Sequence, residues 1–171
     1  MPSTKGSSPR AKREASSAGA ASRKGKARET KQQWSIEPYV GVGPITFGMR
    51  RPQVAKLLGA PTKINDDKLL GSFFEWRDAL ELVYEGGKLV EAKIKRPLGI
   101  EYDGIELWQT KDVAKQLKAR SKDWEDTGWL LNFRDLGFVL GGFGKRRIPE
   151  GKQVIVYGSS RAATYRDFLK A

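Results

Sequence analysis

A residue pattern that is written twice is the strongest constraint on the fold of this chain. The segment VAKLL at residues 54–58 is echoed by VAKQL at residues 113–117, a separation of 59 (113 minus 54). The segment WRDALEL at residues 76–82 is echoed by FRDLGFV at residues 133–139, a separation of 57 (133 minus 76). Because the two echoes follow in the same order at nearly one period, they predict two degenerate copies of one structural unit.

The first copy predicts a helix followed by antiparallel strands. Pro52 suits the first turn of a helix, where its missing N–H costs little, and Gly59 suits the position after the last turn. Aromatic or alternating segments then predict strands at residues 72–76, 80–84 and 90–94. A Gly-Gly pair between the last two strands favours a tight hairpin.

Together these patterns predict the fold class α+β, with two tandem helix-plus-antiparallel-sheet repeats that form one sheet with helices on one face. Repeat one spans about residues 36–97 and repeat two about residues 98–158. The segment at residues 153–157 predicts the last strand, and a C-terminal helix is expected at about residues 160–170. The folded domain is expected to span residues 34–171.

Residues 1–33 differ in composition from the rest of the chain. They hold nine Lys or Arg and two Glu, a charge of +7 (9 minus 2), and the remaining 23 basic and 18 acidic residues leave +5. Without Leu, Ile, Val, Phe, Tyr or Trp, this segment cannot bury enough surface to offset its ordering entropy, so a disordered basic arm is predicted. Non-specific binding of nucleic acid and a solubilising role are equally open interpretations. The candidate nucleic-acid-binding residues are Lys12, Arg13, Arg23, Lys24, Lys26 and Arg28.

The chain contains neither cysteine nor histidine. These absences exclude disulfides, metal sites built on Cys or His, and the Ser-His-Asp and Cys-His nucleophile systems. We therefore expect no cofactor, no metal and no catalytic site. The sequence also lacks an apolar run long enough for a membrane span and the apolar block of a secretory signal. A cytoplasmic protein without membrane attachment is expected.

Residues 45–61 carry a recognisable signature. They contain Gly48-Met49, then Val54, then Leu57-Leu58-Gly59 and Pro61. This run resembles the signature of β-lactamase-inhibitory-protein-like domains, shared with the small lipoproteins of outer-membrane assembly, and the two-copy pattern over roughly residues 36–157 is similar to the tandem inhibitor architecture. The chain departs from the pattern at Arg50, where Ser or Thr is usual, and it has no lipobox cysteine.

The resemblance implies a protein-binding scaffold without catalytic activity. Small bacterial immunity proteins encoded beside toxins have a similar opening. The leading prediction is therefore an immunity or inhibitor protein of a bacterial cytoplasm, which neutralises a cognate toxin or another enzyme by direct binding.

Aromatic residues are the candidates for contact with a protein partner, because Trp and Tyr are enriched in interface hot spots. Burial in the core is the competing interpretation of the same residues. The acidic run at residues 123–126 could meet a basic partner or form a solvated loop. The partner-binding candidates are Trp76, Tyr84, Trp124, Trp129 and Tyr157.

A metal-dependent nuclease is an alternative hypothesis. Asp78, Glu91 and Lys93 have the residue types and spacing of a centre in which carboxylates hold a divalent ion and a lysine assists the attacking water. Alternation on any half-exposed strand also produces Glu-x-Lys, and Arg77 would compete with a metal for Asp78.

Two glycine-containing segments predict hairpins rather than nucleotide sites. Residues 41–43 lack the strand-turn-helix context of a dinucleotide fingerprint, and residues 141–145 lack the spacing of a phosphate-binding loop. Lys145-Arg146-Arg147 in the second segment could contact phosphate or form a solvated loop tip.

Overall fold

The computed structural model describes residues 33–168, which form an α+β fold dominated by strands. This part of the chain contains thirteen strands, three α-helices and one short 3₁₀ helix. None of the helices within residues 33–168 is long and apolar enough to cross a membrane.

Three short strands precede the first helix, and four longer strands and a two-strand hairpin separate it from the second helix, which is followed by four more strands. The strands are β1 (Gln33–Glu37), β2 (Gly41–Val42), β3 (Ile45–Thr46), β4 (Lys63–Asp67), β5 (Ser72–Arg77), β6 (Leu80–Glu85), β7 (Lys88–Lys95), β8 (Gly99–Tyr102), β9 (Ile105–Glu106), β10 (Trp124–Asp126), β11 (Leu130–Phe133), β12 (Phe138–Gly141) and β13 (Gln153–Tyr157). The helices are α1 (Arg51–Leu58), α2 (Val113–Arg120), η1 (Ser159–Arg161) and α3 (Ala162–Phe168).

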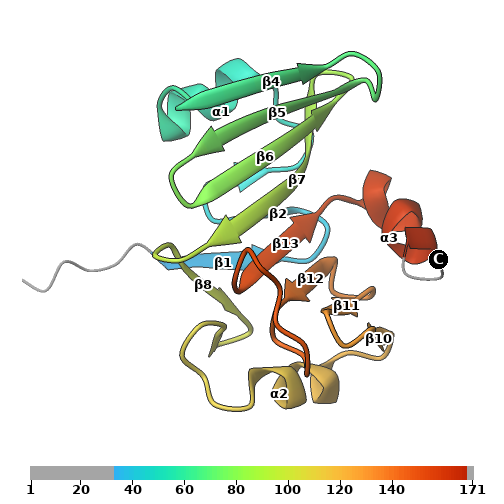
Figure 1. The fold of residues 1–171 in the computed structure, drawn as a ribbon. Helices are drawn as coiled ribbons and strands as arrows, with labels where there is room; N and C mark the ends of the chain where they lie inside the picture. Colours follow the sequence, from blue (N-terminus) through green and yellow to red (C-terminus); the bar gives the residue numbers. More distant parts are fainter. Residues whose placement is uncertain (1–32, 169–171) are drawn as a thin grey trace, which may run out of the picture. The chain divides into compact units, whose positions relative to one another are not determined.

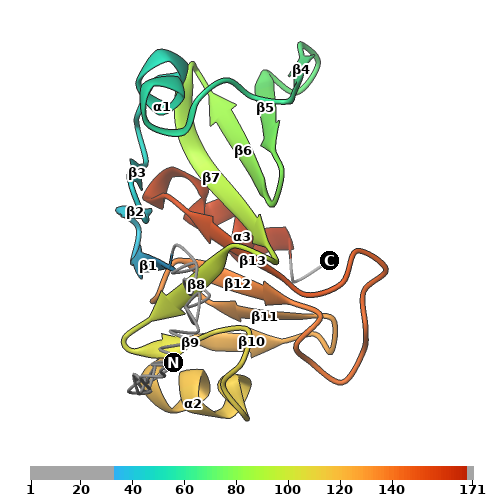
Figure 2. The ribbon, with the colours of Figure 1, turned by 90° about the vertical axis from the view of Figure 1, so that its left-hand side faces the viewer.

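The strands form two sheets, so the expectation of one sheet is wrong. The larger sheet is antiparallel and has the order β10-β11-β12-β13-β7-β6-β5-β4, with β7 and β13 paired at its centre through Ala92 and Val156. The smaller sheet has the order β3-β2-β1-β8-β9, in which β1 runs parallel to β8 (Figures 1 and 2). The second sheet exists because the apolar side chains of Trp34 and Ile100 are buried in the same core as the large sheet.

Helices α1 and α2 lie toward opposite ends of the large sheet (Figures 1 and 2). Val54 of α1 and Leu117 of α2 are fully buried in one core with Leu82 and Phe133 of the sheet. We call the sheet face that carries these core side chains the inner face and the opposite one the outer face.

Helix α3 lies on the outer face, so the expectation that all helices cover one face is wrong. Its Tyr165 ring stacks on Tyr157 of β13, with ring centroids 4.3 Å apart, and Ala162 packs on the same small cluster. Val139 and Ile155 belong to the same cluster, against which Tyr39 and Leu130 also pack. Apolar side chains on both faces of β12 and β13 therefore require a cover on each side.

The sequence signals around α1 are confirmed. Pro52 lies in the first turn, and the Gln53 side chain accepts a hydrogen bond of 2.7 Å from the backbone N–H of Arg50. Gly59 follows the last turn with a φ of 79°, which glycine adopts without steric cost. Val54 is the side chain that docks this helix on the sheet.

In the second sequence echo, side chains at matched positions point to opposite faces of the sheet. Trp76 lies on the outer face, because its neighbours Glu75 and Arg77 point toward α1 and successive strand residues alternate. Phe133, the residue matched to Trp76, is buried in the inner core. A shift of one residue in register reverses the face of every side chain in a strand, so these two segments are not equivalent position by position.

Candidate functional site

Two of the predicted partner-binding aromatics lie inside the protein. Tyr84 belongs to the inner core, where its hydroxyl donates to Glu75, and Tyr157 is covered by α3. Burial raises the pKa of each phenol above its ordinary value. Neither ring can contact a partner without disrupting the core. The predicted partner-binding role of both residues is therefore wrong, and their role is structural.

Trp76 lies on the open part of the outer face, beside Phe74 of the same strand. The two rings stack with centroids 6.0 Å apart and planes 20° apart, and Lys63 Nζ lies 5.1 Å from the Trp76 ring centroid. Both aromatic side chains are partly exposed. Helix α3 covers the outer face at β12 and β13. At β5, the Phe74 and Trp76 rings form an aromatic surface that is partly open to solvent.

The loop between β4 and β5 carries two leucines in solvent. Leu69 is 94% exposed and Leu70 is 70% exposed. An Asp67 carboxylate oxygen accepts hydrogen bonds from the backbone N–H groups of both residues, at 3.1 Å and 3.0 Å. This Asx-type arrangement holds the loop in one conformation, so the leucines are displayed on an ordered turn.

Strand β4 is an edge of the large sheet and carries the exposed Ile64. Ile64 is paired with Glu75, so it points to the inner side of the sheet. Large apolar side chains on the other side extend from the loop onto the outer face of β5. Such a concentration on one hairpin is unusual for a surface that only meets water. We call the set of tip and outer-face side chains the hairpin surface: Leu69, Leu70, Phe74 and Trp76.

A buried carboxylate anchors the hairpin to the rest of the domain. Glu75 of β5 accepts hydrogen bonds from Arg51 of α1 at 2.8 Å, from Arg77 at 2.8 Å and from the Tyr84 hydroxyl at 3.0 Å. Burial opposes the charged form of Glu75, but the hydrogen bonds from Arg51 and Arg77 outweigh it and lower the pKa. The hairpin surface therefore lies on a rigid support.

The other predicted tryptophans lie in the second half of the domain. Trp124 lies on the edge strand β10, with Lys118 Nζ 4.2 Å from its ring centroid, and Trp129 lies in the next loop, with Arg146 Cζ at 5.3 Å. Both rings are exposed. The aromatic candidates therefore divide between separate parts of the molecule rather than forming one surface.

The acidic run at residues 123–126 belongs partly to strand β10 rather than to a solvated loop. Arg134 pairs with Asp123 at 2.6 Å and with Glu125 at 2.7 Å, and the hydrogen bond from Arg134 lowers the pKa of Asp123. Lys118 pairs with Asp126 at 2.9 Å. These internal partners satisfy the carboxylates that were candidates for a basic partner.

The structure does not bring the three nuclease candidates together. Asp78 lies in the β5–β6 turn, whereas Glu91 pairs with Arg161 at 3.0 Å and Lys93 pairs with Glu81 at 3.0 Å. The strand register places Glu91 opposite Val83, in the middle of β6, whereas Asp78 lies before the strand begins. Within residues 33–168, no group of three carboxylate, His or Cys side chains is arranged to hold a metal.

Lys12, Arg13, Arg23, Lys24, Lys26 and Arg28, the candidate nucleic-acid-binding residues of the arm, lie outside the described residues.

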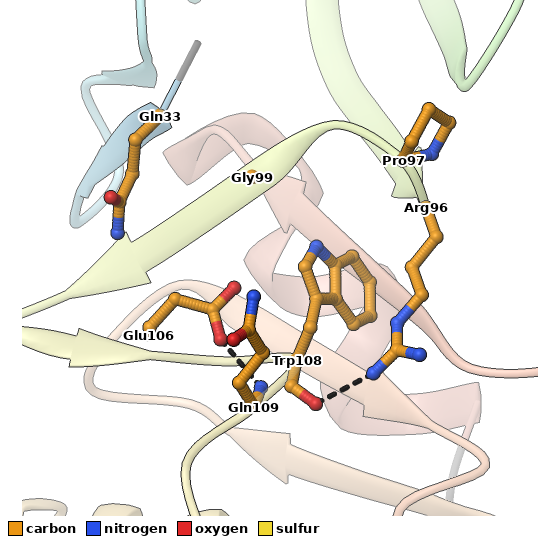
Figure 3. A pocket seen from close by; sticks show the side chains of 7 residues that line it. All are labelled: Gln33, Arg96, Pro97, Gly99, Glu106, Trp108 and Gln109. Carbon is orange, nitrogen blue, oxygen red and sulfur yellow. Dashed lines mark hydrogen bonds between the residues drawn. The ribbon is translucent and has the colours of Figure 1, made fainter. Parts of the chain in front are cut away.

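A hollow of about 290 Å³ lies between β8, β9 and the segment after β7 (Figure 3). Arg96 donates a hydrogen bond of 2.7 Å to the Trp108 carbonyl oxygen, and Glu106 accepts one from the Gln109 backbone N–H. Its two charged side chains are therefore partly satisfied by the protein. The volume is at the low end for a small-molecule site, and Glu106 is the single carboxylate among the seven lining residues, so they offer no pair of carboxylates for acid–base chemistry.

Comparison with family models, with curated proteins and with solved structures gave no match to this chain.

The leucines of the hairpin surface were not among the sequence candidates. The sequence does carry a signal for them, because Leu69-Leu70 lies between the charged Lys68 and the turn-forming Gly71. Apolar side chains in such a turn have no core to enter. Phe74 was also missed as a candidate. Its outward direction is known only because the next residue of the strand, Glu75, points inward.

Proposed function

We propose that this chain is a non-catalytic protein-binding module of the inhibitor or immunity class, and that the hairpin surface is its contact surface. The observation that carries the proposal is the pair of exposed leucines held on an ordered turn by Asp67. Exposed leucines lower the solubility of a protein, and their burial in a pocket of a partner contributes favourable free energy to binding.

The composition of the hairpin surface favours a protein partner. It combines a protruding apolar tip with a stacked Phe74–Trp76 pair and a flanking Lys63. Aromatic anchors surrounded by polar side chains are typical of protein interfaces. Because the turn and the sheet are ordered before binding, little conformational entropy is lost on association.

We further infer that the two halves of the domain are copies of one unit, as in the tandem inhibitor architecture. The first half has three short strands before its helix and the second half has two, and four antiparallel strands follow the helix in each half. The last strands of the two halves, β7 and β13, pair antiparallel at the centre of the large sheet. Val54 and Val113, which are equivalent in the first echo, are both buried in the inner core.

In the proposed mechanism the chain blocks its target by occupancy and performs no reaction. The tip leucines enter an apolar recess of the partner, and the outer face of β5 covers the rim of that recess. The partner is a toxin or another enzyme, encountered in the cytoplasm of a bacterial cell, as the resemblance to immunity proteins implies. Neutralisation is then complete at one inhibitor per target.

The test compares cross-linking at the tip with cross-linking at a matched site. A photoreactive amino acid is placed at position 69 in one variant and at position 57 in the other, since Leu57 of α1 is also exposed, at 50%. We expect the position-69 variant to become cross-linked to one discrete protein and the position-57 variant to none.

The identified protein is then mixed with purified chain. The wild-type chain and Leu57→Asp should form a 1:1 complex that abolishes the activity of the target, whereas Leu69→Asp/Leu70→Asp should lose both complex and inhibition. Equal binding by the two charged variants would show that the hairpin surface is not the contact. A complex without inhibition would reject the inhibitor class while keeping the surface.

A further inference from the structure

A ladder of two stacked aromatic rings with a cation at each end lies away from the hairpin surface. Arg96 Cζ lies 6.0 Å from the Trp108 ring centroid, Trp108 stacks on Phe143 at 5.8 Å, and Lys152 Nζ lies 4.6 Å from the Phe143 ring centroid. The ladder connects the strands that precede α2 with the loop between β12 and β13.

Hollows lie along this ladder. The hollow of about 290 Å³ contains Arg96 and Trp108, and a second, of about 570 Å³, contains Phe143 and Lys152. Lys152 also lines a third hollow, of about 260 Å³, together with Arg147. We call the second and third hollows, which share Lys152, the basic groove.

The basic groove carries positive charge that the domain does not neutralise. Lys115, Arg147 and Lys152 are exposed, and none of them forms an ion pair with a carboxylate within residues 33–168. Lys118 lines the same groove but pairs with Asp126. Asp112 is the carboxylate in the described lining, so cations outnumber it.

The β12–β13 loop, which carries Arg147 and Lys152, is tied to the loop before β11. The Arg146 backbone N–H donates to the Gly128 carbonyl at 2.9 Å, and the Gly142 N–H donates to the Trp129 carbonyl at 3.0 Å. The exposed Trp129 ring beside Arg146 adds an aromatic surface at this position. The side chains therefore lie on an ordered loop.

We propose that the basic groove binds single-stranded nucleic acid. Phosphates lie along Lys115, Lys152 and Arg147, and a base stacks on the Trp129 ring. The groove combines unpaired cations with the Phe143 ring in its lining, and the exposed Trp129 is hydrogen-bonded through its carbonyl to Gly142 of the same lining. Cations beside aromatic rings are the features that single-strand binding uses. An acidic peptide without aromatic residues would use the cations but has no ring to stack on Trp129. The basic groove is independent of the hairpin surface and of any target bound there.

The test uses the full chain and a fluorescein-labelled oligothymidylate of 12 nucleotides, with affinity measured by anisotropy from low to moderate salt. The groove variant is Lys115→Glu/Arg147→Glu/Lys152→Glu. The control is Lys56→Glu/Lys68→Glu/Lys88→Glu, which changes the net charge equally at exposed positions elsewhere. All variants are checked for the wild-type circular dichroism spectrum and urea midpoint.

The groove variant should bind at least about tenfold more weakly than the control at 0.1 M salt, and the slope of log K against log salt should fall by about 2 to 3. Trp129→Ala should weaken binding about fivefold or more without changing that slope, because it removes stacking and no charge. Equal weakening by the groove and control variants would overturn the proposal. Equally tight binding of poly-L-glutamate would reject nucleic acid as the occupant.

Discussion

The guanidinium of Arg161 lies 3.0 Å from the buried carboxylate of Glu91 and 2.7 Å from that of Glu85. These contacts join η1, at the start of the C-terminal helical segment, to β6 and β7. Arg161 is therefore a connection between the outer-face helix and the centre of the sheet, and Glu91 is a structural carboxylate in this fold.

Replacement of Arg161 by Ala should lower the free energy of unfolding by about 2–4 kcal/mol, because it leaves the Glu91 carboxylate buried without its partner. Lys93→Ala, which breaks the more exposed pair with Glu81, should cost about 1 kcal/mol or less. Urea unfolding followed by tryptophan fluorescence measures both. Similar losses for the two variants would contradict the anchoring role of Arg161.

Replacement of Glu75 by Gln should destabilise the domain in a pH-dependent way. The folded pKa of Glu75 is lowered, so its carboxylate stabilises the fold above the unfolded pKa of about 4.3 and loses this contribution as the pH falls through the folded value. At pH 7 the loss is expected to be about 2–3 kcal/mol, since Arg51 and Arg77 lose a charged acceptor.

The measurement is urea unfolding of the wild type and Glu75→Gln between pH 7 and pH 3. The stability difference between the two proteins should be constant near neutrality and shrink below about pH 4.3. A difference that stays constant to pH 3 would show that the Glu75 charge does not contribute.

Replacement of Asp67 by Ala should loosen the hairpin tip while leaving the fold intact. The variant loses the two hydrogen bonds to the Leu69 and Leu70 N–H groups, so amide hydrogen exchange at these positions should accelerate. The global free energy of unfolding should fall by no more than about 1 kcal/mol. Asp66→Ala is the control, and equal exchange rates in the two variants would argue against an ordered tip.

Replacement of Gly43 by Ala should cost far more than the same change at Gly86. The two glycines have nearly the same φ, 56° and 55°, so both substitutions strain the backbone, by about 1–2 kcal/mol. At Gly43 the new Cβ would also lie 2.5 Å from the Trp34 ring, whereas at Gly86 it meets open space. The Gly43 variant should therefore lose at least about 3 kcal/mol in thermal or urea unfolding. Equal losses would exclude the Trp34 contact as the reason.

Local signals predicted the elements that depend on local backbone preferences. Pro52 and Gly59 marked α1 correctly, and the Gly86-Gly87 pair marked the β6–β7 hairpin. In contrast, β4 was not predicted, because the segment KINDD has a single residue with strand preference. It becomes a strand through hydrogen bonds to β5, which no local pattern reports.

The exposed or buried position of each aromatic side chain was also beyond local patterns. Tyr84 and Trp76 both lie on alternating strands, yet Tyr84 is buried beside Glu75 and Trp76 faces solvent. Composition and periodicity were sufficient to predict an α+β fold with a helix followed by antiparallel strands, because these depend on turn chemistry and on the spacing of apolar residues. Strand register, the placement of α3 on the outer face and the surfaces left uncovered arise from contacts between residues distant in sequence, so they become visible only in three dimensions.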